Sequence, residues 1–317
     1  MKINYVAYLN PFEFNGGGEM IMNDLLTYAN NMGYEINISS IRPFQRNYKE
    51  NADLTISCDV FNEPTLKERF DSDFIEQIVR DDKYIHFDNS YVDVCDLAYL
   101  PCNGNSQDNC QYKSMFNLKD NIQRRSLSTK CLHSKNIIHE MYKNSVANIF
   151  LSPLHYEKIS TMLQIEERPY FVLRPTVDTG KFYNMSQLRD IDYIFAGAIS
   201  EAKGVENLKN YFNGTDKNLL MIGKNIYGEE LSFAEYTGFI PYEEMPKYFN
   251  RAKNFIYLPR WPEPQGRVVV EAALCGCNLI TNENVGATSF NFDISDKNNL
   301  KDAVTEFWEY LDNIIGR

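Results

Sequence analysis

Residues 260–277 read RWPEPQGRVVVEAALCGC, and the rest of the chain is interpreted outward from this stretch. Glu263 and Glu271 stand eight residues apart with Gly266 between them, and the apolar run after Gly266 predicts a helix. A helix N-terminus attracts phosphate through its exposed N–H groups, and a glycine lets backbone approach a ligand closely. Carboxylates accept hydrogen bonds from sugar hydroxyls. The combination therefore predicts a site for a nucleotide sugar.

Four other segments extend the pattern. They are GGGE at 16–19, FVLRPTVDTGKF at 171–182, FAGAISEAKG at 195–204 and YTGFIPYEEMPKYFNRAKNFIYLPR at 236–260. With the E-x7-E spacing they resemble the retaining GT-B glycosyltransferases of the glycogen-synthase-like and sucrose-synthase-like group, also called glycosyl transferases group 1. The resemblance is dense from about Tyr170 to Gly286 and sparse before it. It implies a GT-B fold, in which two Rossmann-like domains face each other across a donor cleft.

Length and composition agree with this fold and exclude other classes. The chain has 317 residues, which is enough for two domains with separate cores. A net charge of −11 argues against a nucleic-acid partner, because such proteins usually carry a basic face. The N-terminal MKINYVAYLN lacks the features of a signal peptide, and no apolar run approaches the length of a membrane span. We expect a cytoplasmic protein, and a peripheral membrane contact stays open.

Strand-like apolar runs alternate with helical patterns over most of the chain. INYVAYL, ADLTISCDV and KYIHFD are strand-like in the first half, as are DYIFAGAIS, NLLMIG and NFIYLP in the second. This alternation predicts the α/β class, with mostly parallel sheets that carry helices on both faces. Pro175 and Gly180 interrupt the pattern, so we place the interdomain linker at 175–190. The predicted domains are an acceptor domain at 1–178 and a donor domain at 179–317.

The resemblance implies a role for each residue of the first stretch. Glu271 takes the place of the family's second Glu, which accepts hydrogen bonds from the donor ribose. Glu263 takes the place of the first Glu, which contacts hydroxyls of the transferred sugar on its reactive side. The backbone N–H groups that follow hold the sugar and the phosphates. They belong to Gln265, Gly266, Arg267 and Val268. The alternatives are a solvated helix carboxylate for Glu271 and a plain loop residue for Glu263.

A second donor-binding segment begins at Gly197 and contains Lys203. The departing diphosphate develops negative charge, which cations stabilise. Family members usually supply an Arg and a Lys here, but this chain has Ala198 where the Arg is usual. Either Arg260 or Arg267 replaces the missing charge, or the enzyme is slow or inactive. Arg260 could otherwise be an ordinary surface residue.

Three further places are assigned by the same resemblance. Gly17 and Gly18 lie in a turn that family members bring close to the donor phosphates, although a merely flexible turn stays open. Gly238 and Phe239 resemble a segment whose backbone contacts the nucleobase. His86 ends a predicted strand, where open α/β sheets bind ligands, and matches a His that many members place beside the transferred sugar. The predicted catalytic residues are Glu263, Lys203, His86 and Arg260. The remaining histidines are expected at the surface: His133, His139 and His155.

The seven cysteines leave two interpretations open. Cys95, Cys102, Cys110 and Cys131 fall in one polar segment, with His133 beside the last. They could clip a loop around zinc, but no Cys-x2-Cys pair is present, so scattered thiols are favoured and no metal is predicted. The others are expected to be small core residues: Cys58, Cys275 and Cys277.

The predicted function is that of a retaining, metal-independent glycosyltransferase that needs no cofactor. The donor is a nucleoside diphosphate sugar, and the acceptor is an unknown glycan, lipid or small molecule. The first alternative is a non-catalytic nucleotide-sugar binder or partner subunit, which Ala198 would explain. The second is an epimerase or a phosphorylase of the same fold, because a fold does not determine chemistry.

Overall fold

The computed structural model describes residues 1–14, 16–60, 72–81, 83–95, 136–228 and 231–316. These residues form two compact units, each built on a parallel β-sheet. The chain passes from the first unit to the second between Thr176 and Val177, and it returns to the first unit at Asp302. None of the described helices has the length and apolar character that a membrane span requires.

The first unit contains a six-stranded sheet with the order β2-β1-β3-β4-β5-β6. Its strands are β1 (Lys2–Leu9), β2 (Glu35–Arg42), β3 (Leu54–Cys58), β4 (Tyr84–Phe87), β5 (Ala147–Phe150) and β6 (Tyr170–Val172). Every residue of β3, β4 and β5 is buried. That is expected of central strands covered on both faces, and it explains why they read as short apolar runs.

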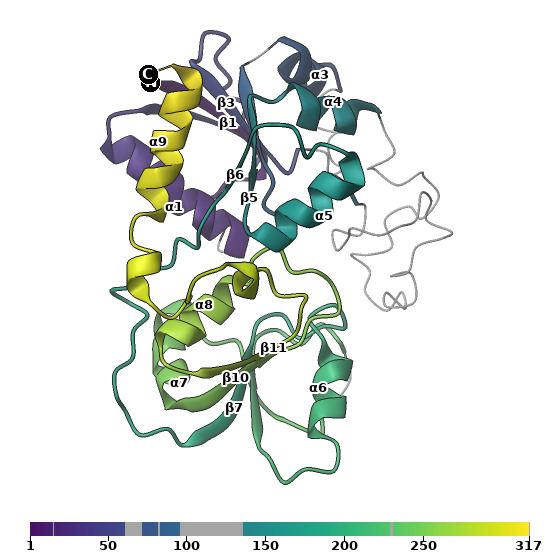
Figure 1. Cartoon of the computed structure of the whole chain (residues 1–317), viewed down its shortest axis with the longest axis vertical. Coiled ribbons are helices and arrows are strands. Elements are labelled where there is room, and N and C mark those ends of the chain that lie inside the picture. Colours follow the sequence, from purple (N-terminus) through teal and green to yellow (C-terminus); the bar gives the residue numbers. More distant parts are fainter. Residues whose placement is uncertain (15, 61–71, 82, 96–135, 229–230, 317) are drawn as a thin grey trace. The chain divides into compact units, whose positions relative to one another are not determined.

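Helices cover both faces of this sheet. They are α1 (Gly17–Asn31), α3 (Ser72–Asp81), α4 (Asn136–Asn144), α5 (Pro153–Leu163) and α9 (Ala303–Ile315). Figure 1 shows α1 and α9 side by side on one face and α4 and α5 on the other. The parallel alternation predicted from the sequence is therefore confirmed in this half of the chain.

Helix α9 corrects the predicted domain boundaries. The sequence prediction placed it with the donor domain at 179–317, but it belongs to the first unit. Its buried side chains Phe307, Trp308 and Leu311 join the core under α1. The indole N–H of Trp308 donates to the carbonyl of Leu25 at 3.0 Å. The helical period shows an apolar face but not which sheet covers it, so this contact was beyond sequence reasoning.

The second unit contains a five-stranded parallel sheet with the order β11-β10-β7-β8-β9. Its strands are β7 (Ile191–Ala196), β8 (Leu219–Ile222), β9 (Glu235–Gly238), β10 (Ala252–Tyr257) and β11 (Asn278–Thr281). Its helices are α6 (Val205–Phe212), α7 (Met245–Arg251), α8 (Arg267–Leu274) and the short 3₁₀ turns η3 (Tyr242–Glu244), η4 (Gly286–Ser289) and η5 (Lys297–Asn299). In Figure 1, α6 lies on one face of the sheet, and α7 and α8 lie on the other.

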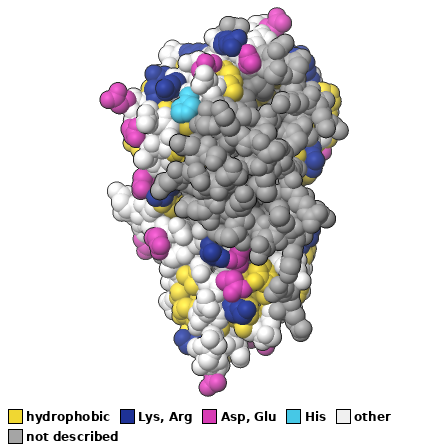
Figure 2. All heavy atoms as spheres, turned by 90° about the vertical axis from the view of Figure 1, so that its right-hand side faces the viewer, with side chains coloured by type: hydrophobic (Ala, Val, Ile, Leu, Met, Phe, Trp, Pro, Cys, Tyr) yellow, Lys and Arg dark blue, Asp and Glu magenta, His cyan; other side chains and the backbone are white. Residues whose placement is uncertain are grey.

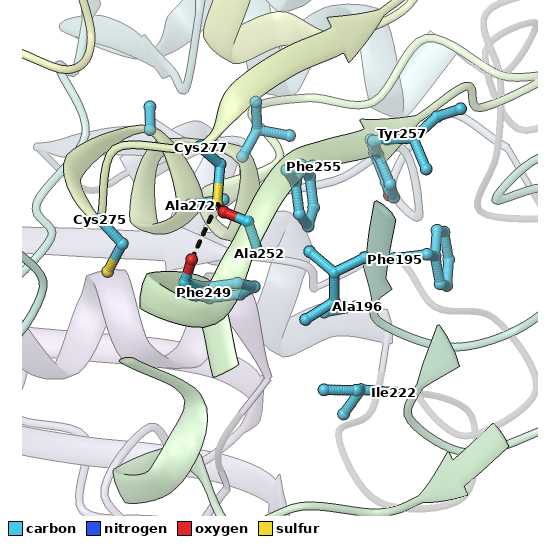
Figure 3. Close-up of a cluster of buried hydrophobic side chains, with 14 of the residues drawn as sticks. Phe195, Ala196, Ile222, Phe249, Ala252, Phe255, Tyr257, Ala272, Cys275 and Cys277 are labelled. Atoms are coloured by element: carbon cyan, nitrogen blue, oxygen red, sulfur yellow. Dashed lines mark hydrogen bonds between the residues drawn. The ribbon is translucent and has the colours of Figure 1, made fainter. Parts of the chain in front are cut away.

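The core of the second unit is aromatic and includes two cysteines (Figure 3). The thiol of Cys277 donates to the carbonyl of Phe249 at 3.1 Å, and Arg189 donates to the carbonyl of Cys275 at 2.7 Å. Burial raises the pKa of Cys275 to about 12 and that of Cys277 to about 11, so both remain protonated thiols. Together with buried Cys58, they are the small core residues that the sequence predicts.

Candidate functional site

Three glycines end three neighbouring strands of the second unit. They are Gly197 after β7, Gly223 after β8 and Gly238 at the end of β9. The N–H of Gly197 donates to the carbonyl of Ile222 at 3.0 Å, and the N–H of Gly223 donates to the carbonyl of Gly238 at 3.0 Å. All three have positive φ, and a Cβ on Gly223 would lie 1.9 Å from the carbonyl oxygen of Gly197. The carboxyl edge of the sheet is therefore bare backbone, as close approach of a ligand requires. Sequence reasoning missed Gly223, although it directly follows an apolar strand.

Lys203 and Glu263, which are both predicted to be catalytic, contact each other in the second unit. The ammonium of Lys203 contacts Oε2 of Glu263, and the hydroxyl of Tyr257 donates to the same oxygen at 2.7 Å. The ammonium also lies 4.9 Å from the ring of Trp261. The carboxylate thus has two donors, and the Lys side chain is confined by an aromatic ring.

The packing around Gly204 explains why a glycine follows Lys203. Its φ is +90°, and a Cβ on it would lie 1.9 Å from the carbonyl oxygen of Leu258. The side-chain amide of Asn207 donates to the same carbonyl at 2.9 Å. The absent side chain at Gly204 therefore lets the start of α6 pack directly on the end of β10, which brings Lys203 to Glu263.

The loop that carries Glu263 is held at both ends. The N–H of Glu263 donates to the carbonyl of Asn284 at 2.7 Å, and the N–H of Gly286 donates back to Glu263 at 3.0 Å. The side-chain amides of Asn282 and Asn284 donate to the carbonyl of Pro259 at 2.9 and 3.1 Å. With 13% of its side chain exposed, Glu263 is a positioned carboxylate and not a plain loop residue.

Glu271 is buried on α8, with 4% of its surface exposed. The hydroxyl of Tyr242 donates to its Oε1 at 2.7 Å, and Nε of Arg267 donates to the same atom at 3.2 Å. Burial raises the pKa of Glu271, which Arg267 and Tyr242 partly oppose. The alternative of a solvated helix carboxylate is therefore wrong. Tyr242 was not found from the sequence, because nothing local links it to Glu271.

The residues predicted to supply backbone N–H groups begin α8. Gly266 precedes the helix with φ +80° and ψ +56°, a left-handed conformation that favours glycine. Gln265 and Arg267 are buried, and Val268 is half-buried. The first N–H groups of a helix have no partner within it, which is the arrangement that attracts a phosphate.

The two arginines proposed to replace the missing family Arg are both engaged. The guanidinium of Arg260 contacts the carboxylate of Glu201, and its backbone N–H donates to the carbonyl of Ala202 at 2.9 Å. Arg267 is paired with Glu271. Ala198 is exposed. Arg260 therefore lies against the turn that carries Lys203, but its charge is shared with a carboxylate.

The nucleobase segment ends in an exposed aromatic ring. Phe239 follows β9 and is 79% exposed. The hydroxyl of Tyr236 donates to the carbonyl of Gly223 at 2.7 Å and accepts from the N–H of Asn225 at 3.2 Å. This tyrosine connects the ends of β8 and β9 beside Gly238, so the backbone predicted to contact the base is held by a side chain.

In the first unit, Gly17 and Gly18 form the first turn of α1. A Cβ on Gly18 would lie 2.6 Å from Nδ2 of Asn89, which follows β4. Burial raises the pKa of Glu19 in the same turn. Gly18 is therefore closely packed, so the interpretation as a merely flexible turn does not fit it, whereas Gly17 is exposed with open space where its Cβ would lie.

His86 lies in a buried polar cluster at the carboxyl ends of β4 and β5. Its Nε2 is 3.7 Å from Oδ2 of Asp93, and Nε2 of His155 is 3.6 Å from Oδ1 of Asp88. The hydroxyl of Tyr142 donates to Asp88 at 2.5 Å. Burial lowers the pKa of His86 to about 4. We call these five residues the histidine cluster.

His155 corrects a prediction, since it was expected at the surface and is fully buried. Ser152 caps α5, and its hydroxyl oxygen accepts from the N–H of His155 at 3.0 Å. This cap places the first turn of α5 at the end of β5, so the side chain points into the unit. Its Nδ1 accepts from the N–H of Leu151 at 3.4 Å, which leaves the proton on Nε2, facing Asp88.

The zinc interpretation concerns residues that are mostly not described. Cys95 is buried, whereas Cys102, Cys110, Cys131 and His133 lie outside the described residues. Within the part of the chain that the structure describes, no group of His, Cys, Asp and Glu could hold a metal ion.

A protein-family model matches part of the second unit. The model of the family "Glycosyl transferases group 1" matches residues 181–293. The match confirms the resemblance to glycosyl transferases group 1 that was inferred from the sequence, and its range contains Lys203, Glu263 and Glu271. A comparison with curated proteins found no match.

Solved glycosyltransferase structures share the fold over nearly the whole chain, and the fold is GT-B. Sucrose-phosphate synthase from Thermosynechococcus elongatus has a TM-score of 0.62 and 13% identity, over 97% of this chain and 90% of that one. HepE from Anabaena, in complex with UDP and glucose, has a TM-score of 0.55 and 12% identity, over 99% of this chain and 92% of that one. AviGT4, involved in avilamycin A biosynthesis, has a TM-score of 0.53 and 12% identity, over 100% of this chain and 98% of that one. At these identities the likeness shows the fold alone.

Proposed function

We propose that the protein is a retaining glycosyltransferase that uses a nucleoside diphosphate sugar as donor. One observation carries the proposal: Glu263 lies in the loop before α8, Glu271 lies on α8 itself, and Lys203 contacts Glu263. The group 1 family match covers all three residues. HepE, which shares the fold, was solved with UDP-glucose, so the fold accommodates such a donor in that protein.

The geometry supports a separate role for each of these groups. Glu271 would accept hydrogen bonds from the ribose, and Glu263 would hold hydroxyls of the transferred sugar. The N–H groups at the start of α8 and the ammonium of Lys203 would oppose the charge that develops on the diphosphate as it leaves. Since Lys203 contacts Glu263, a donor phosphate would share this ammonium with the carboxylate. The place of His86 beside the transferred sugar remains a prediction, and this side chain is fully buried.

The first experiment is an assay with a panel of donors. UDP-glucose, UDP-galactose, UDP-N-acetylglucosamine, GDP-mannose and ADP-glucose are incubated with the protein, and the released nucleoside diphosphate is measured with and without glycan, lipid and small-molecule acceptors. Release that requires the protein supports the proposal. The Glu263→Gln protein is the control for contaminating hydrolases, and release at an equal rate in that protein would contradict the proposal.

Two finer features need their own measurements. Proton NMR of the product gives its anomeric configuration, and a product with the configuration of the donor supports a retaining reaction. The same rate in the presence of a chelator supports metal independence. Four further features remain predictions: the acceptor, the cytoplasmic location, the absence of a nucleic-acid partner and a peripheral membrane contact.

Figure 2 shows acidic and basic side chains interspersed over the described part of one face of the protein.

A non-catalytic nucleotide-sugar binder is the second candidate, and one observation favours it. The cations that could serve the diphosphate are each paired with a carboxylate, namely Lys203 with Glu263, Arg260 with Glu201 and Arg267 with Glu271. Ala198 adds no charge. Calorimetric binding of a donor without any turnover over the whole panel would favour this candidate.

A further inference from the structure

The two carboxylate oxygens of Glu271 have different surroundings. The hydroxyl of Tyr242 and Nε of Arg267 both donate to Oε1, at 2.7 and 3.2 Å. Among the described residues, no hydrogen bond ends on Oε2. The protein therefore holds one oxygen, and the other keeps its capacity to accept hydrogen bonds.

Tyr242 is itself held by side chains that come from a different segment. The ammonium of Lys181 lies 4.2 Å from the centre of the Tyr242 ring and also contacts the carboxylate of Glu243. The ring of Phe182 lies 5.4 Å from that of Tyr242, centre to centre. Cation–π and aromatic contacts of this kind restrict the ring, so the direction of its hydroxyl is set by the tertiary structure.

The same neighbours decide how readily Glu271 stays charged. Burial raises the pKa of Glu271, whereas Arg267, the hydrogen bond from Tyr242 and the charge of Lys181 lower it. A buried carboxylate that lost the Tyr242 bond would hold its proton to a higher pH. A protonated Glu271 would be a weaker acceptor for a hydroxyl than the carboxylate.

We propose that Tyr242, held by Lys181, is a positioning residue that engages Oε1 of Glu271 and thereby presents the ionised Oε2 to the ribose hydroxyls of the donor. This inference rests on the proposed function, because the ribose belongs to the proposed donor. It adds two residues from outside the E-x7-E stretch to the nucleotide site. Neither residue touches the nucleotide in this assignment, since both act through Glu271.

Calorimetric titration of UDP, GDP and ADP into the Tyr242→Phe protein tests the assignment. At pH 8 we expect an affinity about three- to tenfold weaker for the nucleotide that binds best, the range for one lost hydrogen bond. In a Glu271→Ala background the same substitution should change the affinity less than about twofold, because the side chain through which Tyr242 acts is absent. A loss of equal size in both backgrounds would overturn the proposal.

Tyr227→Phe is the matched control. The hydroxyl of Tyr227 donates to Oε1 of Glu206 at 2.5 Å, so the control removes the same kind of bond from the same unit. We expect it to leave nucleotide affinity unchanged. If Tyr227→Phe weakens binding as much as Tyr242→Phe, the effect is a general loosening of the unit and the proposal is wrong.

The pH profile separates positioning from simple structural support. The affinity should fall on the acid side as Glu271 takes up a proton, and in Tyr242→Phe the midpoint of that fall should move to higher pH. Lys181→Met should move it in the same direction by less, which keeps the test valid if Tyr242→Phe does not fold. A midpoint that stays in place in the folded variants would overturn the proposal.

A measurement without nucleotide distinguishes failure of this inference from failure of the proposed function. Carbon-13 NMR of glutamate side chains, with Glu271→Gln to identify the signal, follows the titration of Glu271 directly. If no nucleotide binds, the proposed function fails. A Glu271 titration that is unmoved by Tyr242→Phe contradicts the positioning role itself.

Discussion

The histidine cluster of the first unit and the Lys203–Glu263 site of the second use carboxylates in opposite ways. In the second unit each of the carboxylates Glu201, Glu263 and Glu271 has an Arg or Lys partner. In the histidine cluster, Asp88 and Asp93 face imidazoles, and burial keeps the pKa of His86 near 4. One region therefore contains permanent cations and the other contains groups whose charge depends on protons.

The two regions are suited to different chemistry. Permanent cations stabilise an anion at any ordinary pH, which suits a diphosphate. The buried imidazole of His86, whose pKa is lowered to about 4, is neutral near pH 7 and cannot do so, but it can hold or share hydrogen bonds at the carboxyl edge of a sheet. We therefore expect charge removal to affect turnover in the second unit and pH to affect stability in the first.

The largest effect is expected for Lys203→Ala. Removing the cation that opposes leaving-group charge should lower turnover about 100-fold or more, the typical range for one such interaction. The thermal midpoint should change much less, because the ammonium is partly exposed. Initial rates and midpoints are compared with those of Lys209→Ala, which removes an exposed Lys from α6. A collapse of the midpoint, or an equal loss of rate in the control, would show that Lys203 is structural.

The next effect concerns the pH dependence of stability in the first unit. His86 has a folded pKa of about 4, below the value of about 6.5 in an unfolded chain, so the unfolded state takes up the proton first as the pH falls. Its contribution is complete above pH 6.5 and is lost down to about pH 4, a loss of about 3 kcal/mol. His86→Gln should lack this loss. Asp59, whose pKa burial raises, is present in both proteins and does not affect the difference between them.

The two tryptophans make this measurement specific to one unit. Trp308 lies in the first unit and Trp261 in the second, and the chain has no others. Urea unfolding followed by Trp308 fluorescence in a Trp261→Phe background, at several pH values between 7.5 and 4.5, reports on the first unit alone. His139→Gln, on α4, is the matched control and should keep the acid-side loss. If the free energy of unfolding changes with pH by the same amount in the Trp261→Phe protein with and without His86→Gln, the assignment is wrong.

A smaller effect is expected for Arg260. If its guanidinium turns from Glu201 to the diphosphate, Arg260→Ala should lower turnover about tenfold, one charge-assisted contact. Ala198→Arg, which restores the family pattern, should then recover part of the rate in the Arg260→Ala protein. Rates of the four proteins form a double-mutant cycle. Additive effects would show that the two positions do not serve one phosphate, and Arg267 would become the next candidate.

No effect is expected from metal removal. Protein purified without added metal should contain no stoichiometric zinc, and a chelator should leave the urea unfolding of the first unit unchanged. Elemental analysis measures this directly. Zinc that survives the chelator would restore the interpretation of Cys95, Cys102, Cys110 and Cys131 as a metal clip.

The sequence alone determined the parts of this protein that depend on local pattern. Alternating apolar runs predicted the parallel α/β sheets, because side-chain period reflects burial directly. The spacing of Glu263, Gly266 and Glu271 predicted a ligand site at a helix start, because a glycine lets backbone approach a ligand and the first N–H groups of a helix attract phosphate. Lys203 and Gly204 were found through the resemblance of residues 197–204 to a segment of the family, and the structure adds that a Cβ at Gly204 would meet the carbonyl of Leu258.

The tertiary structure decided which distant groups share an environment. Helix α9 joins the first unit because its apolar face fits the core beside α1, and a helical period does not name a partner. Tyr242 reaches Glu271 across 29 residues, and Trp308 bonds to Leu25 across 283. His155 is buried against Asp88 although it was expected at the surface. Burial, charge pairing and proton affinity are properties of such contacts, so they arise only when the chain has folded.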